Sequence, residues 1–295
     1  MKRNALQKQD WNKRLVRQSY LQEIRRRLAS HSDTPYLDAQ VLLGHVVDRS
    51  RSWLLAHPEF SPTPDQEQDI QHALQQLENG TPLPYVIGSW EFYNLRFHLT
   101  PSVLIPRPET EMLVDYAIHW LDNHPRKTRC ADVGTGSGCV AISIADHCPK
   151  TQFLAGDIDL NSLQVARKNI HQHRLSEKIS LFQGYLLQPV STRLDLIVAN
   201  LPYIPTNRLA NLSVTENEPR KALDGGEDGL RLIRAFLSTA PRKVSPGGLI
   251  LLEIDGSHGQ EAALLGQRAF PGAKISIARD LQGLDRMLII HTNRP

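Results

Sequence analysis

The tetrapeptide Asn200-Leu201-Pro202-Tyr203 carries residue types suited to chemistry on a planar amino group. The Asn200 side-chain oxygen and the backbone oxygen of Leu201 are two acceptors for the hydrogens of an –NH2 group. Pro202 stiffens the turn, and Tyr203 offers an aromatic face on which a flat group could stack. Since an amide nitrogen is a poor nucleophile, such a site would act by orienting it toward an electrophile. The plainer interpretation is a strand followed by a proline turn.

A glycine loop, Gly134-Thr135-Gly136-Ser137-Gly138, follows Asp132 between an expected strand and an expected helix. Glycines there let the backbone turn tightly and approach a ligand closely. A phosphate-binding P-loop is excluded because the chain contains no Gly-Lys pair. The dinucleotide fingerprint G-x-G-x-x-G is disfavoured because Cys139 holds the place of its last glycine.

S-adenosylmethionine fits this loop better, because it lacks a pyrophosphate and calls for acids as well as glycines. We expect Asp132 to face the cationic methionine end. Asp157 ends the next expected strand, nineteen residues after Gly138, where a carboxylate can accept from both ribose hydroxyls. Asp159 completes an Asp-x-Asp pair of a kind that binds metals, but magnesium is disfavoured and no metal is expected. The sequence therefore favours S-adenosylmethionine as the cofactor.

Alternating strands and helices from residue 129 onward would position the glycine loop and the Asn200–Tyr203 tetrapeptide. The pattern is typical of a parallel α/β sheet, which binds ligands at the carboxyl ends of its strands. Helices are expected over residues 139–147 and 163–171. The last two of the expected strands could close the sheet as a pair. Strands are expected over residues 129–133, 152–157, 179–183, 194–199, 249–254, 274–277 and 287–291.

The first part of the chain differs in character. Residues 1–80 show apolar residues at helical spacing and no strand signal, which predicts a small helical domain that recognises a partner. Residues 81–108 predict a linking β-hairpin, formed by residues 85–93 and 95–100, and an extended segment. Residues 109–295 would form the catalytic domain, beginning with a helix that carries acids in its first turn.

The composition describes an ordinary globular chain of 295 residues, 40% hydrophobic and 22% charged. No apolar run approaches the roughly 18 residues of a membrane span, and no secretory signal is present, so we expect a cytoplasmic protein without a membrane partner. Cys130, Cys139 and Cys148 are expected to be reduced thiols rather than zinc ligands. Residues 1–30 carry nine basic and two acidic residues, a net +7, which could make weak contact with RNA but is more simply a solvated helix face.

The sequence resembles the HemK/PrmC family, the N5-glutamine methyltransferases of peptide chain release factors, over nearly its full length. The resemblance implies the class I S-adenosylmethionine-dependent methyltransferase fold: a Rossmann-like seven-stranded sheet with an antiparallel last strand, and a small all-α N-terminal domain joined by a β-hairpin. The motifs that carry it are Leu104-Ile-Pro-Arg-Pro-Glu-Thr-Glu111, Asp132-Val-Gly-Thr-Gly-Ser-Gly138, Asn200-Leu-Pro-Tyr203, Glu218-Pro-Arg-Lys-Ala-Leu223 and Asp228-Gly-Leu230.

By this resemblance, the glycine loop binds S-adenosylmethionine together with Asp132, Asp157 and Asn200. Asn200, with Pro202 and Tyr203, holds the glutamine of the release factor's Gly-Gly-Gln motif, and the helical domain grips the release factor body. Two positions depart from the family pattern. Leu201 replaces a proline, which mainly reduces stiffness. Tyr185 stands where an acid near the adenine is common, so it could stack on that ring instead.

Other functions remain open at this point. A sister family acts on a ribosomal protein glutamine. It looks similar except in the residues that follow the Pro106-Arg107 pair. An exocyclic amino group of RNA or DNA presents the same two hydrogens and flat face, although the Pro106-Arg-Pro-Glu-Thr-Glu111 run and the helical domain argue against it. A binding protein that has lost catalysis is disfavoured, because the glycine loop, Asp157 and Asn200 are all intact.

Overall fold

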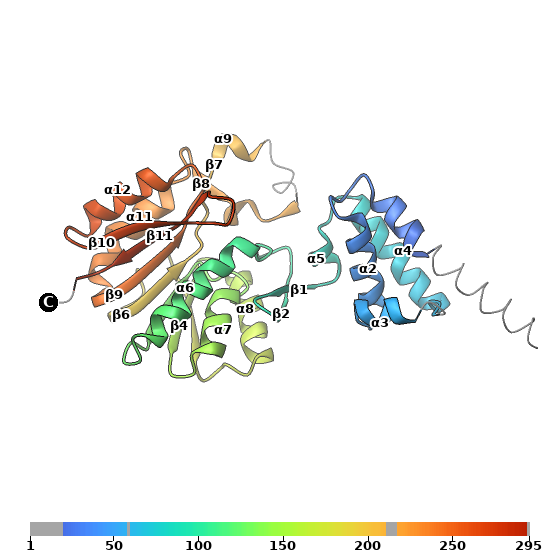
Figure 1. Cartoon of the computed structure of the whole chain (residues 1–295), viewed down its shortest axis with the longest axis horizontal. Coiled ribbons are helices and arrows are strands. Elements are labelled where there is room, and N and C mark those ends of the chain that lie inside the picture. The colour runs from blue at the N-terminus through green and yellow to red at the C-terminus, as the bar shows by residue number, and fades with distance from the viewer. Residues whose placement is uncertain (1–19, 58–59, 211–216, 294–295) are drawn as a thin grey trace, which may run out of the picture. The chain divides into compact units, whose positions relative to one another are not determined.

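The computed structural model describes residues 20–57, 60–210 and 217–293 (Figure 1). The chain divides into two compact units, Met1–Gly88 and Ser89–Pro295. Within the described ranges, no helix is both long enough and apolar enough to cross a membrane. Each unit is described by itself.

Unit 1 is helical in its described part, as the sequence predicts. Residues 20–28 are helical, and the helices that follow are α2 (Pro35–Val46), α3 (Arg51–Ala56), α4 (Pro64–Glu78) and α5 (Leu83–Val86). Helix α4 begins with a capping box between Thr63 and Gln66. Its buried residues are Ile70, Ala73, Leu74 and Leu77, the apolar stripe expected from the spacing.

A β-hairpin opens unit 2, but it is shorter than the sequence suggests. Its strands are β1 (Ser89–Phe92) and β2 (Leu95–His98), joined through Tyr93 and Asn94, whose positive φ angles of 51° and 58° suit a two-residue turn. The expected strand at residues 85–86 is wrong. Those residues lie in α5 because the prolines around Leu83 favour a first helical turn.

A seven-stranded sheet forms the centre of unit 2, as predicted. In spatial order its strands run β10, β11, β9, β6, β3, β4 and β5. All neighbouring pairs are parallel except those of β11, which runs antiparallel to both β9 and β10 and confirms the expected closing pair. The strands are β3 (Arg129–Val133), β4 (Gln152–Asp157), β5 (Ile179–Gln183), β6 (Leu194–Ala199), β9 (Val244–Glu253), β10 (Lys274–Arg279) and β11 (Asp285–His291).

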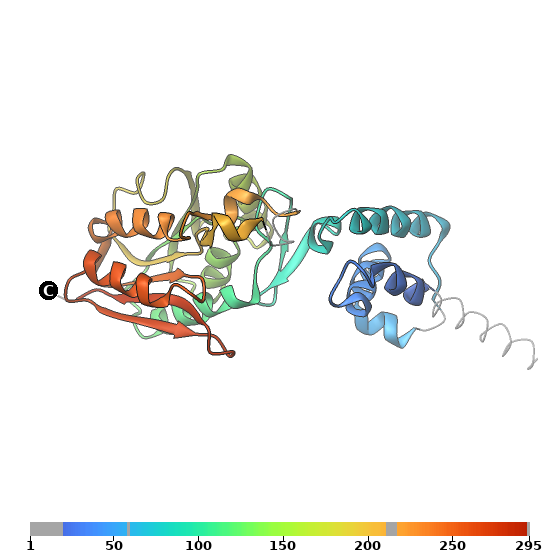
Figure 2. The ribbon, with the colours of Figure 1, turned by 90° about the horizontal axis from the view of Figure 1, so that it is seen from above.

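Helices cover both faces of the sheet (Figures 1 and 2). On one face lie α6 (Glu111–Asp122), α7 (Cys139–His147) and α8 (Leu160–Gln172); on the other lie α11 (Arg231–Thr239) and α12 (Gly259–Ala269). Because strand residues alternate between the faces, Ile197 and Ala199 of β6 pack under α11 with Phe236. The shorter elements are η1 (Pro108–Thr110), β7 (Ile204–Pro205), α9 (Thr206–Leu209), η2 (Arg220–Ala222), β8 (Asp224–Gly226) and η3 (Ala240–Arg242).

The order of the strands creates a switch point beside β3. From β3 the chain moves outward to β4 and β5, and then returns to β6 on the other side of β3. The connections after β3 and β6 therefore diverge and leave a crevice at the carboxyl ends of these two strands, where open α/β sheets bind ligands. The glycine loop follows β3 and Asn200 follows β6, so the fold brings the two predicted segments to that crevice.

Candidate active site

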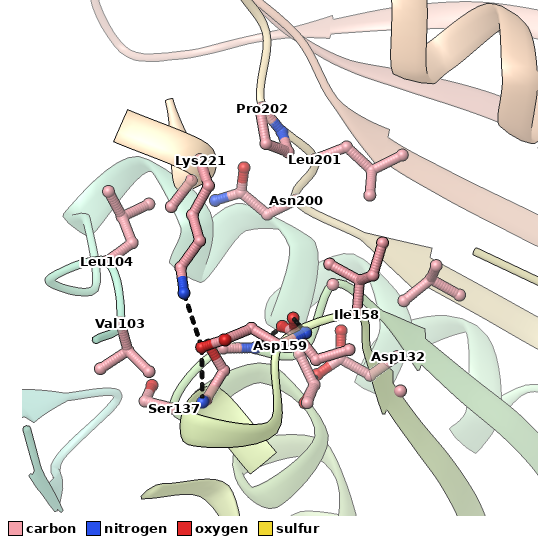
Figure 3. Close-up of a pocket in the computed structure, with 18 of the residues that line it drawn as sticks. Val103, Leu104, Asp132, Ser137, Ile158, Asp159, Asn200, Leu201, Pro202 and Lys221 are labelled. Carbon is pink, nitrogen blue, oxygen red and sulfur yellow. Dashed lines mark hydrogen bonds and ion pairs between the residues drawn. The ribbon is translucent and has the colours of Figure 1, made fainter. Parts of the chain in front are cut away.

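A cavity of about 340 Å³ opens at this crevice (Figure 3). Its walls come from the segment before α6, the glycine loop, the end of β4, the turn after β6, and residues 221–222. Every site residue expected from the sequence lines it except Gly138 and Tyr203. A volume of this size is in the range of small-molecule sites.

Strand pairing holds the two halves of the cavity together. Strands β3 and β6 are adjacent and parallel, with Val133 paired to Ala199. The residues that follow, Gly134 and Asn200, therefore leave the sheet at the same level on strands that are about 4.8 Å apart. A molecule bound by the glycine loop and a group bound by Asn200 would thus lie next to each other.

The backbone of the glycine loop has a conformation that residues with a side chain rarely adopt. Gly134, Gly136 and Gly138 have φ angles of 76°, 55° and 82°, in the left-handed region that favours glycine. The Gly134 and Thr135 amides donate to the Gly156 carbonyl of β4, at 2.8 and 2.9 Å. Gly138 is the N-cap of α7, and Cys139 and Val140 in the first turn of that helix line the cavity.

Asp132 lies beneath this loop and is buried, with 2% of its surface exposed. Its Oδ2 accepts from the Thr135 hydroxyl at 2.7 Å and from the Ala141 amide at 3.3 Å. Burial raises the pKa of its carboxyl to about 6, against the effect of those two hydrogen bonds. The carboxyl therefore holds the loop while it also lines the cavity, where a cationic group would stabilise its ionised form.

Asp157 ties the loop to the end of β4. Its Oδ2 accepts from the Gly136 amide at 3.0 Å and its Oδ1 from the Asp159 amide at 2.9 Å. Each carboxylate oxygen can accept more than one hydrogen bond, so both remain able to take a ribose hydroxyl. Burial raises the pKa of Asp157 as well. The buried Asp132 and the half-buried Asp157 make this side of the cavity fit a ligand that carries positive charge and hydroxyl groups.

Asn200 is half-buried at the edge of the cavity (Figure 3). Its Nδ2 donates to Thr110 Oγ1 at 3.1 Å, while its Oδ1 has no partner among the described residues. Leu201 is 4% exposed, and a Cβ added to Gly134 would lie 3.1 Å from Leu201 Cδ2. The leucine in place of the family's proline is therefore held by burial against the glycine loop.

The Tyr203 side chain is bound to the end of β9. Its hydroxyl donates to Glu253 Oε1 at 3.0 Å, and burial raises its pKa. The side chain is not among those that line the cavity. Its stacking on a substrate stays a prediction.

Two ion pairs at the cavity join segments that lie far apart in the chain. Arg107 pairs with the buried Glu218, whose Oε2 also accepts from the Ile105 amide at 3.0 Å. Lys221 reaches across to Asp159, with 2.7 Å between Nζ and Oδ2 (Figure 3). The motifs that contain these residues were recognisable, but partners more than 60 residues apart in sequence were not.

The remaining predicted polar groups have ordinary structural partners. Asp159 caps α8 by accepting from the Ser162 amide at 3.0 Å. Nowhere in the described parts of the chain do three or more His, Cys, Asp or Glu side chains gather as metal ligands would. Cys130, Cys139 and Cys148 are buried free thiols, as expected.

Comparison with known proteins agrees with this geometry. Residues 19–88 match the PrmC N-terminal domain, and residues 110–224 match the methyltransferase small domain. A release factor glutamine methyltransferase of Moorella thermoacetica is 38% identical over 278 residues, which cover 94% of this chain and 98% of that protein. One of Coxiella burnetii is 38% identical over 269 residues, covering 90% and 95%. This chain belongs to the release factor glutamine methyltransferase family.

Solved structures support the fold of this chain. A methyltransferase from Pyrococcus furiosus has a TM-score of 0.51 at 16% identity, and the match covers 78% of this chain and 100% of that one. Such low identity bears on the fold alone. The predicted family, its class I methyltransferase fold and its cofactor, S-adenosylmethionine, are confirmed.

Proposed function

We propose that this protein methylates the side-chain nitrogen, N5, of the glutamine in the Gly-Gly-Gln motif of peptide chain release factors. The observation that carries the proposal is the placement of Asn200. Its nitrogen is bound to Thr110, and its oxygen is left at the edge of a cavity whose other side is the glycine loop. An amide oxygen in that position can accept a hydrogen of the substrate's –NH2 group.

S-adenosylmethionine would be held by Asp132, the loop from Gly134 to Gly138, and Asp157. The raised pKa values of Asp132 and Asp157 mark places where a cation and hydroxyl groups would relieve the cost of desolvation. When bound, S-adenosylmethionine supplies the methyl group from its sulfonium. The sulfur that loses the methyl group becomes a neutral thioether. The side chains of Ile158 and Tyr185 line the same cavity and are exposed. Tyr185 is suited to stack on the adenine.

The protein would act on the glutamine by orienting it. The Asn200 Oδ1 and the Leu201 carbonyl accept the two N–H groups, and Pro202 limits the motion of the turn between them. Fixed acceptors align the nitrogen lone pair and stabilise the positive charge that grows on this nitrogen during transfer. The extra proton leaves after the new N–C bond forms.

The helical unit 1 is proposed to recognise the release factor body. The basic segment within residues 1–30 could add weak contact with RNA, but most of that segment lies outside the described residues. We propose the cytoplasm as the place of action, since translation termination takes place there.

The test is incubation of a recombinant release factor with this protein and methyl-labelled S-adenosylmethionine, followed by mass spectrometry of the Gly-Gly-Gln peptide. We expect one methyl group on the glutamine, and none when that glutamine is changed to alanine. Asn200→Ala should lower kcat about 100-fold, by analogy with the loss of one preorganised polar group, while cofactor binding in calorimetry persists. Methylation of RNA or of a ribosomal protein in place of the release factor would overturn the proposal, and an Asn200→Ala variant with normal kcat would overturn the assigned role.

A further inference from the structure

The Asn200 side chain can serve the proposed function in only one of its two orientations. A carboxamide has nearly the same shape after a 180° flip, but the flip exchanges an acceptor for a donor. With the nitrogen toward the substrate, two –NH2 groups would face each other and no hydrogen bond could form. Some other group must therefore keep the oxygen on the cavity side.

Thr110 alone cannot fix this orientation. Its Oγ1 lies 3.1 Å from Asn200 Nδ2 and accepts from it. A hydroxyl is both a donor and an acceptor, so an isolated threonine could equally well donate to the flipped oxygen. The direction of the hydrogen bond depends on where the Thr110 proton is held.

Glu253, the last residue of β9, supplies a place for that proton. It is 3% exposed, and Oε1 accepts from the Tyr203 hydroxyl at 3.0 Å, whereas Oε2 is buried without a partner of ordinary hydrogen-bond geometry among the described residues. Burial raises the pKa of this carboxyl, and hydrogen bonds from the Thr110 and Tyr203 hydroxyls lower it. The Tyr203 hydroxyl thus directs its proton at Oε1, and the unpartnered Oε2 is available to accept the proton of the Thr110 hydroxyl.

We propose that Glu253 and Thr110 are positioning residues that fix the Asn200 amide with its oxygen toward the substrate. When ionised, the Glu253 carboxylate only accepts hydrogen bonds, and in that state it draws the single proton of Thr110. Thr110 is then able only to accept from Asn200, and the amide nitrogen must face it. This inference rests on the proposed function, because the orientation matters only if an –NH2 group is the substrate.

Substitutions at Thr110 separate positioning from packing. Thr110→Val keeps the shape but removes the hydroxyl, and we expect kcat on the release factor to fall about tenfold, the value of one hydrogen bond. Thr110→Ser keeps the hydroxyl and should retain kcat within about twofold, since little but a methyl group is lost. Thr151→Val is the matched control, because Thr151 is also buried and donates to Cys148 O at 2.7 Å in a turn away from the cavity.

Glu253→Gln tests whether Glu253 sets the direction of the hydrogen bond between Asn200 and Thr110. A glutamine amide can donate to Thr110, which would let Thr110 donate to the flipped Asn200 oxygen. We expect a loss similar to that of Thr110→Val and no further loss when both are combined, because both act through one amide. In an Asn200→Ala background, Thr110→Val should leave kcat unchanged. If Thr110→Val lowered kcat in that background as much as it does in the wild type, Thr110 would have a packing role and the proposal would be overturned.

The outcomes also separate this inference from the proposed function. A wild-type protein without activity on the release factor would refute the function and the inference together. An active wild type with an equally active Thr110→Val would refute only the positioning role. A spectroscopic readout is independent of turnover: the Asn200 side-chain –NH2 signals, identified by their absence in Asn200→Ala, should exchange with solvent slowly in the wild type and fast in Thr110→Val. Equal exchange in both would also overturn the proposal.

Discussion

The Asp132 carboxyl offers a test of the electrostatics of the cavity. In the ligand-free protein burial raises its pKa from 3.8 to about 6. A raised folded-state pKa means that the protonated carboxyl favours folding fully below pH 3.8, and that this contribution is lost as pH rises through about 6. A shift of this size corresponds to about 3 kcal/mol. Asp132→Asn cannot ionise, so at pH 8 the ligand-free variant should be more stable than the wild type by up to that amount.

The same substitution should have the opposite effect on the cofactor. The ionised Asp132 would attract the cationic methionine end, and its loss should weaken cofactor binding by about 1.5–3 kcal/mol, or roughly 10- to 100-fold in Kd. In the wild type, binding should release a proton near the pKa of about 6 and weaken below it. Calorimetric titrations in buffers of different ionisation enthalpy measure that proton release.

Urea unfolding of the ligand-free proteins between pH 4 and pH 8 decides the first half of this prediction. The stability difference should be small at pH 4 and grow as pH rises through about 6. Asp146→Asn is the control, because Asp146 is exposed on α7 and should change neither stability nor affinity. A variant less stable than the wild type by a constant amount at every pH would show that Asp132 acts mainly through its bonds to Thr135 and Ala141. That result would refute the reasoning from burial.

Two further predictions concern ion pairs of unit 2. Lys221→Met removes the ammonium that lies 2.7 Å from Asp159 and leaves more negative potential for a cationic cofactor. Affinity should rise a few-fold at low salt in calorimetry and approach the wild-type value at high salt, while unfolding changes by less than about 1 kcal/mol. Asp195→Ala removes the buried carboxylate of β6 that accepts from the Thr128 and Arg129 amides at 3.2 and 3.1 Å. It should lower the unfolding free energy by about 3 kcal/mol in urea and leave kcat on the release factor unchanged.

The sheet could be predicted from the sequence because its strands are buried on both faces. Such strands appear as short apolar runs between loops, and β6 has every residue buried. The prediction was less successful where local residues give mixed signals. The Pro246-Gly-Gly stretch suggests a turn, yet β9 runs from Val244 through it, and the pairing with β6 shifts register between Leu194 and Leu196 to accommodate it. A proline in a sheet is tolerated at such an irregularity.

The site was predictable only where one segment carries the whole signal. The glycine loop and Asp157 each follow a strand, so their common edge of the sheet follows from the topology. Thr110 and Glu253 are the opposite case. Thr110 belongs to the recognisable Leu104–Glu111 motif, but nothing in that motif or around Glu253 indicates a relation to Asn200, which exists only because η1 and the end of β9 pack beside the turn after β6. The hydrogen bond of the Tyr203 hydroxyl to Glu253 likewise could not be anticipated from the sequence.

Distance and orientation in this active site are controlled by different parts of the chain. The pairing of Val133 with Ala199 sets how far the glycine loop lies from Asn200, and this pairing belongs to the backbone of the sheet. In the positioning that we propose, the hydrogen bond from Asn200 to Thr110, with Glu253 holding the Thr110 proton, sets which end of the Asn200 amide faces the cavity. A substitution in the second group should therefore lower kcat without moving the cofactor. A shift of one residue in the β3–β6 register would also turn the apolar side chains of β6 to the wrong face, so changes in distance would come only with loss of the fold.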